Sequence, residues 1–390
     1  MSLTLARRMG ALRSSAIRDL LTVTARPDVL SLAGGLPDPE LVPHERIRQE
    51  VDRVLGSPDA LQYTETAGWF GLREVVAARE TGQVAPDEVV ITHGSQQALS
   101  LLAQVLLDPG ASVVVEEPAY PGALQVFRAA ESRVLTVPLD VDGMRTDRLE
   151  ALLDSGERPV LVHTVSNFHN PRGATMTAAR RAHLAGLAER FGFWVLEDDP
   201  YGELYYDGPP PEPVATHSDR VIRLSSASKI LAPALRVGWL RGPREVCAAV
   251  ELVKQGADLC GSSLIHQVAT GLLTDGPWLD AHLTAIRAQY GARATALHSA
   301  LVGEFGDAVE VTAAAGGMFG WVEFRDGTDT DALLRAAVER RVAFVPGSAF
   351  AVDGGHRHGA RVCFTTNTAA TLEVAVERLA EAHRTLVVTT

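Results

Sequence analysis

The stretch VIRLSSASKILAPALRVGWL, residues Val221–Leu240, combines two strand-like runs with a serine-rich turn that carries Lys229. Lysine is rare in this protein: of its 36 basic side chains, only Lys229 and Lys254 are lysines. Arginine stays protonated at accessible pH, whereas a lysine with a depressed pKa becomes a neutral amine that can attack a carbonyl and form a Schiff base. Lys229 is therefore either an amine kept for chemistry or an ordinary solvated side chain. Lys254, on an amphipathic helix, is predicted to take no part in chemistry.

Upstream of this stretch the chain alternates between short apolar strands and amphipathic helices. Strands are predicted at 87–92, 111–117, 133–139, 158–165, 193–198, 220–225 and 236–242, and helices at 95–107, 146–155 and 177–192. A capping pattern opens helix 146–155, and Gly192 ends helix 177–192. Near-continuous apolar strands separated by helices are typical of a parallel sheet that is covered on both faces. The sequence therefore predicts an α/β fold with a mostly parallel central sheet.

The pattern changes near residue 265. A long helix at 280–305 is followed by strand residues within 309–324, a helix at 330–341, a strand at 360–366 and a final helix at 371–382. This order predicts a second, smaller α+β domain built on an antiparallel sheet. The large domain is predicted at 51–265, and the small domain is predicted to be discontinuous, at 1–50 and 266–390. Residues 1–21 are expected to form an N-terminal arm or first helix, with an amphipathic targeting helix as the alternative.

Composition and motifs exclude several classes of function. The net charge of −12 argues against nucleic acid or an anionic membrane as the main partner, and no apolar run is long enough to span a bilayer. Cys247, Cys260 and Cys363 have no metal or redox spacing, so they are predicted to be reduced thiols of a cytoplasmic protein. His356 and His358 are assigned to a solvent loop rather than to half of a metal site. No dinucleotide-binding, P-loop or serine-nucleophile motif is present.

Polar residues follow nearly every predicted strand at its carboxyl end, where open α/β sheets bind their ligands. They are Ser95 and Gln96, Tyr120, Asn170, Asp198 and Asp199, Tyr201, and finally Ser226, Ser228, Lys229 and Arg236. Ser95 is predicted to be the N-cap of helix 95–107, where its hydroxyl and the free backbone N–H groups form either a phosphate cradle or an ordinary cap. Because side chains alternate along a strand, only one of Asp198 and Asp199 faces a given cavity. The same alternation argues against a metal site at 197–199.

Together these strand ends offer a phosphate site, one carboxylate, an asparagine, two tyrosines and an amine. A phosphorylated aldehyde cofactor needs this set. The amine forms an imine with the aldehyde, and the carboxylate keeps a pyridine nitrogen protonated so that the ring can accept electrons. No metal is required by this set.

The sequence resembles the fold-type I, pyridoxal 5′-phosphate-dependent aminotransferases of class I/II. Within them it is similar to the 2-aminoadipate and kynurenine aminotransferases and to the aminotransferase-like domains of MocR regulators. The blocks that carry the resemblance are SLAGGLPDPELVP, LQYTETAGWFGLRE, VVITHGSQQAL, EEPAYPGAL, NFHNPRG, LEDDPYGEL, SSASKILAPALRVGW, GGMFGWVEF and ARVCFT, in this order along nearly the whole chain. No DNA-binding winged helix precedes Met1, so the aminotransferase part alone is expected.

The resemblance implies a role for each of these positions. Lys229 would form the Schiff base and act as the base of the proton shift, and Asp198 would pair with the pyridine nitrogen. Tyr201 and Asn170 would bind the ring's phenolic oxygen, and Tyr120 would stack on the ring. The phosphate would be held by Ser95, Gln96, Ser226, Ser228 and Arg236, and Tyr63 would reach the phosphate of the neighbouring subunit's cofactor. The substrate would be bound by Arg361, through its α-carboxylate, and by Asn170 and Gly35, with Gly34 close by.

The implied activity is transfer of an α-amino group between an α-amino acid and a 2-oxo acid by a ping-pong mechanism, in a cytoplasmic homodimer with shared active sites. The alternative is a lyase, decarboxylase or oxidase that uses the same cofactor and fold. His169 and Arg172 depart from the usual form of the Asn-Pro turn. If they line the substrate side-chain pocket, they favour an acidic or polar side chain.

Overall fold

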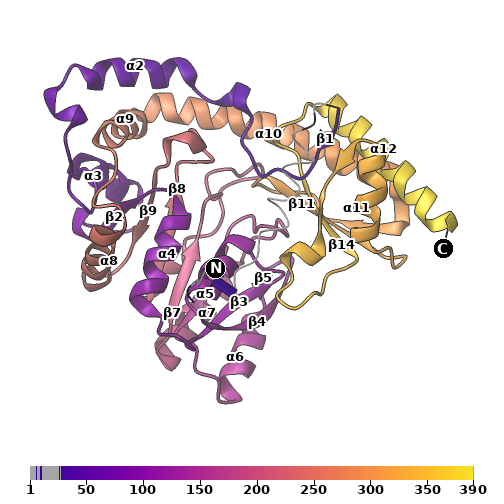
Figure 1. The fold of residues 1–390 in the computed structure, drawn as a ribbon, viewed down its shortest axis with the longest axis horizontal. Coiled ribbons are helices and arrows are strands. Elements are labelled where there is room, and N and C mark those ends of the chain that lie inside the picture. Colours follow the sequence, from indigo (N-terminus) through magenta and orange to yellow (C-terminus); the bar gives the residue numbers. More distant parts are fainter. Residues whose placement is uncertain (1–5, 7–8, 11–25, 27, 390) are drawn as a thin grey trace, which may run out of the picture.

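The computed structural model describes residue 6, residues 9–10, residue 26 and residues 28–389. The predicted N-terminal arm or first helix at 1–21 lies almost entirely outside these residues. The long axis of the described part runs from α2, α3 and α8 at one end to the C-terminal helices α11 and α12 at the other (Figure 1).

The centre of the larger part is an eight-stranded sheet with the order β2-β9-β8-β7-β6-β3-β4-β5. Its strands are β2 Val89–Thr92, β3 Ser112–Glu117, β4 Arg133–Asp140, β5 Gly143–Met144, β6 Leu161–Thr164, β7 Trp194–Asp198, β8 Val221–Ser226 and β9 Gly238–Arg241. Strands β4, β3, β6, β7 and β8 are mutually parallel, β9 runs antiparallel to both of its neighbours, and β5 runs antiparallel to β4. The predicted mostly parallel α/β sheet is confirmed.

Helices cover both faces of this sheet because its strands are apolar on both sides. They are α4 Ser95–Leu106, α5 Pro121–Ala129, α6 Thr146–Asp154, α7 Ala178–Phe191 and α8 Arg244–Ala257. Val113 and Val115 of β3 pack with α4, α5 and α8, whereas Val114, between them, packs with α6 and α7. Gly192 ends α7 in the left-handed conformation, at φ 81°, as predicted.

A second, four-stranded antiparallel sheet with the order β10-β11-β14-β13 forms the core of the C-terminal part. Its strands are β10 Val309–Val311, β11 Phe319–Phe324, β13 Val345–Pro346 and β14 Gly359–Cys363, and its helices are α10 Gly276–Phe305, α11 Thr330–Glu339 and α12 Ala369–Thr389. The N-terminal segment joins this part, since β1 Leu30–Ser31 pairs with β12 Val342–Ala343. In Figure 1, α10 runs from α9 Ser263–Thr274 towards the C-terminal sheet.

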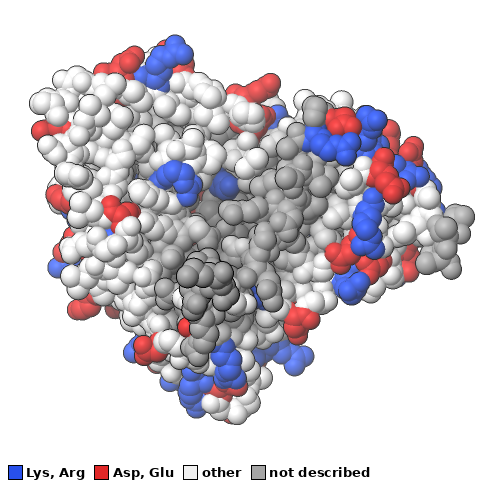
Figure 2. Space-filling model, viewed as in Figure 1, with Lys and Arg blue, Asp and Glu red and all other residues white. Residues whose placement is uncertain are grey.

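Two more helices, α2 His44–Leu55 and α3 Phe70–Arg79, precede the large sheet and pack against α9. Short 3-10 turns are η2 Pro39–Leu41, η3 Pro58–Leu61, η4 Pro86–Glu88, η5 Val214–Thr216, η6 Pro233–Leu235, η7 Gly306–Ala308 and η8 Gly347–Phe350. Among the described residues, no helix combines the length and apolar character needed to cross a membrane. Acidic and basic side chains are mixed over the C-terminal helices, whereas much of the surface between α2 and α4 is uncharged (Figure 2).

Several element boundaries differ from the sequence prediction for local reasons. Helix α10 begins at Gly276 because the side chain of Asp275 accepts a hydrogen bond from the backbone N–H of Trp278, and a proline follows in the first turn. Helix α12 extends beyond the predicted 371–382 at both ends. The N-cap of α4 is Gly94, at φ 77°, so the prediction that Ser95 is the N-cap is wrong and Ser95 is the first helical residue.

Candidate active site

A cavity of about 530 Å³ lies at the carboxyl ends of the parallel strands. Of the predicted site residues, it is lined by Gly35, Ser95, Gln96, Tyr120, Asn170, Asp198, Tyr201, Ser226, Ser228, Lys229, Arg236 and Arg361. Two predicted residues, Gly34 and Tyr63, are not part of this lining, and the Tyr63 side chain is 77% exposed. The cavity thus brings together residues that are up to 326 positions apart, from Gly35 to Arg361.

Lys229 lies in the turn after β8, with its Nζ 3.0 Å from the carbonyl oxygen of Gly35. Burial lowers the pKa of Lys229 to about 8, and the nearby Arg361 and Arg236 add to this effect. Gly35 approaches closely enough because it has no side chain: a Cβ there would stand 2.8 Å from Cζ of Phe319. Lys229 is therefore a half-buried amine that gives up its proton more readily than an ordinary lysine.

Asp198 ends β7 and is 2% exposed. Its Oδ2 lies 3.5 Å from Nε2 of His163, and its Oδ1 is buried without a hydrogen-bond partner among the described residues. A buried carboxylate oxygen without a donor is costly, so this atom is suited to accept a hydrogen bond from a ligand in the cavity. His163, on the neighbouring strand β6, was not predicted. The only sequence signal for it is a titratable ring within a buried strand.

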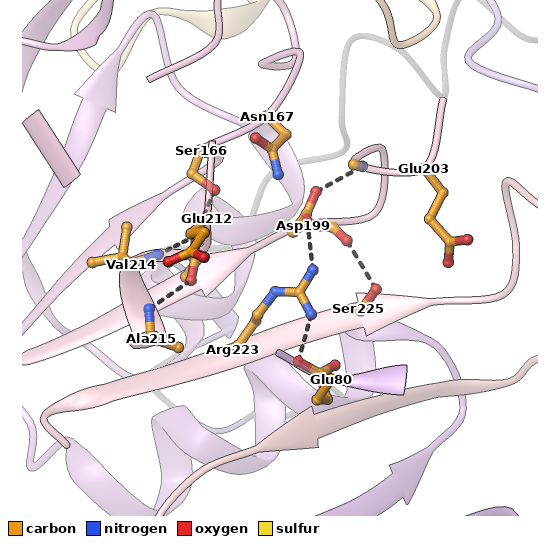
Figure 3. A network of polar contacts seen from close by, with 12 residues as sticks. Glu80, Ser166, Asn167, Asp199, Glu203, Glu212, Val214, Ala215, Arg223 and Ser225 are labelled. Atoms are coloured by element: carbon orange, nitrogen blue, oxygen red, sulfur yellow. Dashed lines mark hydrogen bonds and ion pairs between the residues drawn. The ribbon is translucent and has the colours of Figure 1, made fainter. Parts of the chain in front are cut away.

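Asp199 belongs to a separate network of polar contacts, which includes Arg223 and Glu80 (Figure 3). Its Oδ2 accepts a hydrogen bond of 2.7 Å from Arg223, and Arg223 donates another, of 2.6 Å, to Glu80. Glu197 accepts hydrogen bonds from Ser166 and from the backbone of residues 214–215. Asp198 therefore shares no polar partner with Glu197 or Asp199 among the described residues, as strand alternation predicts.

The first turn of α4 and two neighbouring loops form one end of the cavity. Arg236 Nη2 donates to the carbonyl oxygen of His93 at 2.7 Å, and the hydroxyl groups of Ser226 and Ser228 lie 2.8 Å apart. A Cβ on Gly238 would stand 2.6 Å from Cα of Gly94, so β9 holds this loop at close range. A helix N-terminus, two hydroxyl groups and a guanidinium are the groups that bind phosphate.

Arg361, on β14, is 2% exposed and also lines the cavity. Its Nη1 donates to Oδ1 of Asn170 at 2.8 Å, its Nη2 donates to the carbonyl oxygen of Ala33 at 2.6 Å, and its Nε has no partner within the described part of the chain. The guanidinium carbon lies 4.2 Å from the ring centroid of Phe319. Both hydrogen-bond partners are neutral oxygens, and burial lowers the pKa of Arg361 to about 10. This arrangement suits an incoming carboxylate.

Both tyrosines of the cavity remain protonated at neutral pH. Burial raises the pKa of Tyr120 to about 12 and the pKa of Tyr201 still further. Tyr120 donates its hydroxyl hydrogen to Gln96 at 3.2 Å, and Tyr201 packs edge-to-face against Phe319 at 5.9 Å. Phe319 lines the cavity but was not predicted, because only the packing of β11 against the strand ends brings it there.

His169 and Arg172 do not line this cavity, which corrects the expectation that they shape the substrate pocket. His169 is 1% exposed, and its Nε2 lies 3.1 Å from Oε2 of Glu116 on β3. Arg172 lies over the ring of Trp321, 5.5 Å from its centroid, in a separate cavity of about 500 Å³. The inference of an acidic or polar substrate that rested on these two residues therefore loses its support.

The polar groups of the cavity fit pyridoxal 5′-phosphate. The unpartnered oxygen of Asp198 can accept from the pyridine N–H, and the neutral amine of Lys229 can condense with the aldehyde. The first turn of α4, with Ser226, Ser228 and Arg236, can bind the phosphate. Arg361 is then left for the carboxylate of a substrate.

Comparison with known proteins leads to the same conclusion. Residues 27–379 match the family model for aminotransferases of class I and II. The chain is 39% identical over 385 residues to the 2-aminoadipate transaminase of Thermus thermophilus, with 97% of this chain and 96% of the relative covered. It is 38% identical over 382 residues to aromatic-amino-acid aminotransferase 1 of Thermococcus litoralis, with 95% and 91% covered.

A solved structure agrees with these sequence matches. The α-aminoadipate aminotransferase LysN of Thermus thermophilus, complexed with N-(5′-phosphopyridoxyl)-L-leucine, has a TM-score of 0.92 to this chain at 36% identity, with 99% of this chain and 98% of LysN covered. Fold, cavity and comparisons therefore confirm the resemblance read from the sequence. The chain belongs to the class I and II aminotransferases, and it is a fold-type I enzyme that transfers amino groups with pyridoxal 5′-phosphate as its cofactor.

Proposed function

We propose that this aminotransferase moves the α-amino group between α-amino acids and 2-oxo acids by a ping-pong mechanism, and that the residues of the cavity carry the reaction. The observation that supports the proposal most strongly is the pairing of two groups in one cavity: the amine of Lys229, with a pKa near 8, and the buried guanidinium of Arg361, which has no acidic hydrogen-bond partner among the residues that the structure describes. An amine and a carboxylate-binding group in one cavity match the α-amino and α-carboxylate groups of an α-amino acid.

The bound cofactor supplies an aldehyde carbon and a protonated ring that accepts the electron pair of the substrate Cα. Asp198 would hold the ring nitrogen. Asn170 uses its Oδ1 to accept from Arg361, so its amide NH₂ is left to donate to the ring's phenolic oxygen. Tyr201, kept protonated by burial, would donate to the same oxygen. Lys229, as a neutral amine, would take the proton from the substrate Cα. It would then deliver this proton to the carbon of the cofactor that carried the aldehyde.

A half-reaction tests this proposal. One equivalent of an amino donor is added to the enzyme without any oxo acid, and the absorbance of the bound cofactor is followed. An aminotransferase converts the cofactor to its amine form and releases the oxo acid. If the cofactor instead returns to its aldehyde state and ammonia is released, the chain is a lyase and the proposal is wrong.

Substrates are proposed to be α-amino acids with a free α-carboxylate, because Arg361 has N–H groups left for it. A guanidinium has five N–H donors, and the structure uses one on Nη1 and one on Nη2, so the Nε–H and two others remain. Lysine cannot copy this planar, bidentate arrangement.

Arg361→Lys is therefore expected to lower kcat/KM for every α-amino donor by about 100-fold, or about 2.7 kcal/mol of transition-state stabilisation. Steady-state kinetics with several amino donors provide the measurement. Arg172→Lys, in the separate cavity, is the matched control and should leave these values nearly unchanged. A wild-type preference for terminal amines without a carboxylate, together with an unaffected Arg361→Lys variant, would show that the substrate class is wrong.

We also propose that the enzyme is a homodimer in which Tyr63 reaches the partner's cofactor phosphate. Tyr63 and Leu61 are each 77% exposed, and Leu252 and Leu259, on α8 and just after it, are 69% and 53% exposed. Ser263, four residues after Leu259, donates to the carbonyl oxygen of Asp59, so the two segments are neighbours. Exposed apolar side chains on adjoining segments support an interface between subunits.

Mixing inactive Tyr63→Phe and Lys229→Ala subunits is expected to restore part of the activity. In a mixed dimer one site receives both defects and the other receives none, because each site draws Lys229 from one subunit and Tyr63 from the other. Activity is measured after unfolding and refolding the two variants together. A mixture of two Lys229→Ala preparations, one tagged, is the negative control. A fully active monomer in sedimentation would contradict the proposal.

We also propose a division of the chain into two domains and a cellular location. A small domain made of residues 1–50 and 266–390, beside a large domain at 51–265, is supported by contacts of the N-terminal segment. Leu32 N donates to Ala343 O at 2.7 Å, and Arg293 donates to Asp38 at 2.6 Å. Both boundaries fall inside helices, α2 and α9, which pack against each other and so bridge the two parts. A reducing compartment such as the cytoplasm is supported by three cysteines that are all free.

A further inference from the structure

Lys254, the second lysine of the chain, is fully buried on α8 rather than solvated. Its Nζ donates to both carboxylate oxygens of Asp258, at 2.7 and 3.0 Å. Removing an ammonium group from water costs several kcal/mol unless a carboxylate compensates, and a well-packed apolar side chain often serves stability as well or better. An ion pair between a fully buried lysine and a half-buried aspartate therefore points to a role other than holding α8 in place.

A line of hydrogen bonds runs from this ion pair to the loop that precedes α4. Gln97 Nε2 donates to Oδ2 of Asp258 at 2.7 Å, and Gln97 Oε1 accepts from the backbone N–H of His93 at 2.8 Å. The carbonyl oxygen of His93 accepts from Nη2 of Arg236 at 2.7 Å. Five groups from α8, α4, the loop after β2 and the turn before β9 are thus connected in one line.

The charge of Lys254 fixes the orientation of the side chains in this line. A lysine ammonium can only donate, so the oxygens of Asp258 must accept. Burial alone would raise the pKa of Asp258, but the hydrogen bonds from Lys254 and Gln97 bring the pKa below its usual value and keep the carboxylate charged. Gln97 must then turn its NH₂ towards Asp258 and its oxygen towards the N–H of His93. The charged Asp258 and the N–H of His93 therefore require the same orientation of the Gln97 amide, so the ion pair and the loop before α4 hold this side chain together.

We infer that Lys254 and Asp258 are positioning residues for the phosphate of the cofactor. Through Gln97 they hold residues 93–95, whose chain leads directly into the first turn of α4, and through His93 they hold the guanidinium of Arg236. Neither residue lines the cavity, so neither touches the cofactor. This inference rests on the proposed phosphate site and adds to it the groups that keep the site in shape.

The test compares two ligands that differ only in the phosphate. Dissociation constants of pyridoxal 5′-phosphate and of pyridoxal are measured by equilibrium dialysis with the full-length chain and with Lys254→Met and Gln97→Met. Both variants are expected to bind pyridoxal 5′-phosphate roughly tenfold more weakly, the loss expected from about one misplaced charged hydrogen bond, while the affinity for pyridoxal stays unchanged. If both ligands weaken equally, or neither weakens, the inference is overturned.

Two further variants separate this inference from the proposed phosphate site. Arg236→Met removes a proposed phosphate ligand directly and must weaken pyridoxal 5′-phosphate more than pyridoxal, otherwise the phosphate site itself is wrong. If Arg236→Met shows that selective loss and Gln97→Met does not, the phosphate site stands and the positioning role fails. Glu251→Gln, on α8, is the matched control and should alter neither constant. Gln97→Met decides the question alone if the buried change at Lys254 prevents folding.

Discussion

Replacing Lys229 with alanine is expected to lower kcat by about 10⁴-fold or more, the range over which a positioned base accelerates proton transfer. The amine of Lys229 is the group in the cavity that combines a pKa near 8 with a position beside Gly35, where the N-terminal segment closes the site. Alanine removes both the group that condenses with the cofactor and the group that moves the proton. Single-turnover kinetics at saturating cofactor and amino donor measure the loss of chemistry apart from the loss of cofactor affinity.

Chemical labelling identifies the same lysine without relying on turnover. Borohydride treatment of the yellow holoenzyme is expected to link the cofactor to Lys229, and peptide mass spectrometry locates the link. Lys254 provides an internal control because it is fully buried and engaged with Asp258. At saturating cofactor, Lys254→Met should keep most of its kcat. Label found on Lys254, or nearly normal turnover in Lys229→Ala, would overturn the assignment.

Asp198→Asn is expected to lower kcat by roughly 10³-fold, comparable to the loss of one preorganised charge at a reacting centre. Asp198 presents a buried, unpartnered oxygen at the end of β7, and an amide there can no longer keep a pyridine nitrogen protonated. The thermal stability of the ligand-free protein should change little, because Oδ1 of Asp198 makes no hydrogen bond to any described residue. Steady-state kinetics and thermal unfolding, measured on the same preparation, separate the two effects.

Asp199→Asn is the matched control, one residue away and equally buried. It removes the carboxylate that faces Arg223, which also pairs with Glu80, and is expected to cost about 3 kcal/mol of unfolding free energy with kcat largely retained in the folded fraction. The opposite result, a large kinetic loss at Asp199 and a mild one at Asp198, would mean that the strand register assigned to the two carboxylates is shifted by one.

The grouping of Asp198, Asn170 and Lys229 could be predicted from the sequence because parallel strands end at one edge of a sheet. Period-two alternation was enough to separate Asp198 from Asp199. Gly192 was a reliable helix end for an equally local reason, its freedom to adopt positive φ. These predictions depend on local geometry or on a general rule of parallel sheets, and not on which side chains meet across the fold.

The errors arose where distant segments decide the outcome. His169 turns towards Glu116 of β3, and Arg172 turns onto Trp321 of β11, and neither partner is near the Asn-Pro turn in sequence. Ser95 is displaced from the N-cap by Gly94, which β9 approaches through Gly238. Lys254 pairs with Asp258, only four residues away. The hydrogen bond that links this pair to the loop before α4 comes from Gln97, which lies 161 residues before Asp258. Sequence spacing cannot show such partners.

The pairing of Leu30 with Val342, and the bond from Arg361 to Ala33, set an order of events during protein synthesis. The N-terminal segment leaves the ribosome first, but its partners are about 310 and 328 residues further along the chain. At about 5 to 20 residues per second, it waits at least some fifteen seconds before those partners exist. The central sheet can form meanwhile, since β9 ends at Arg241. The substrate site is therefore completed only after residue 361 has been synthesised, and a nascent chain that stalls before this residue lacks the guanidinium proposed to bind the substrate carboxylate.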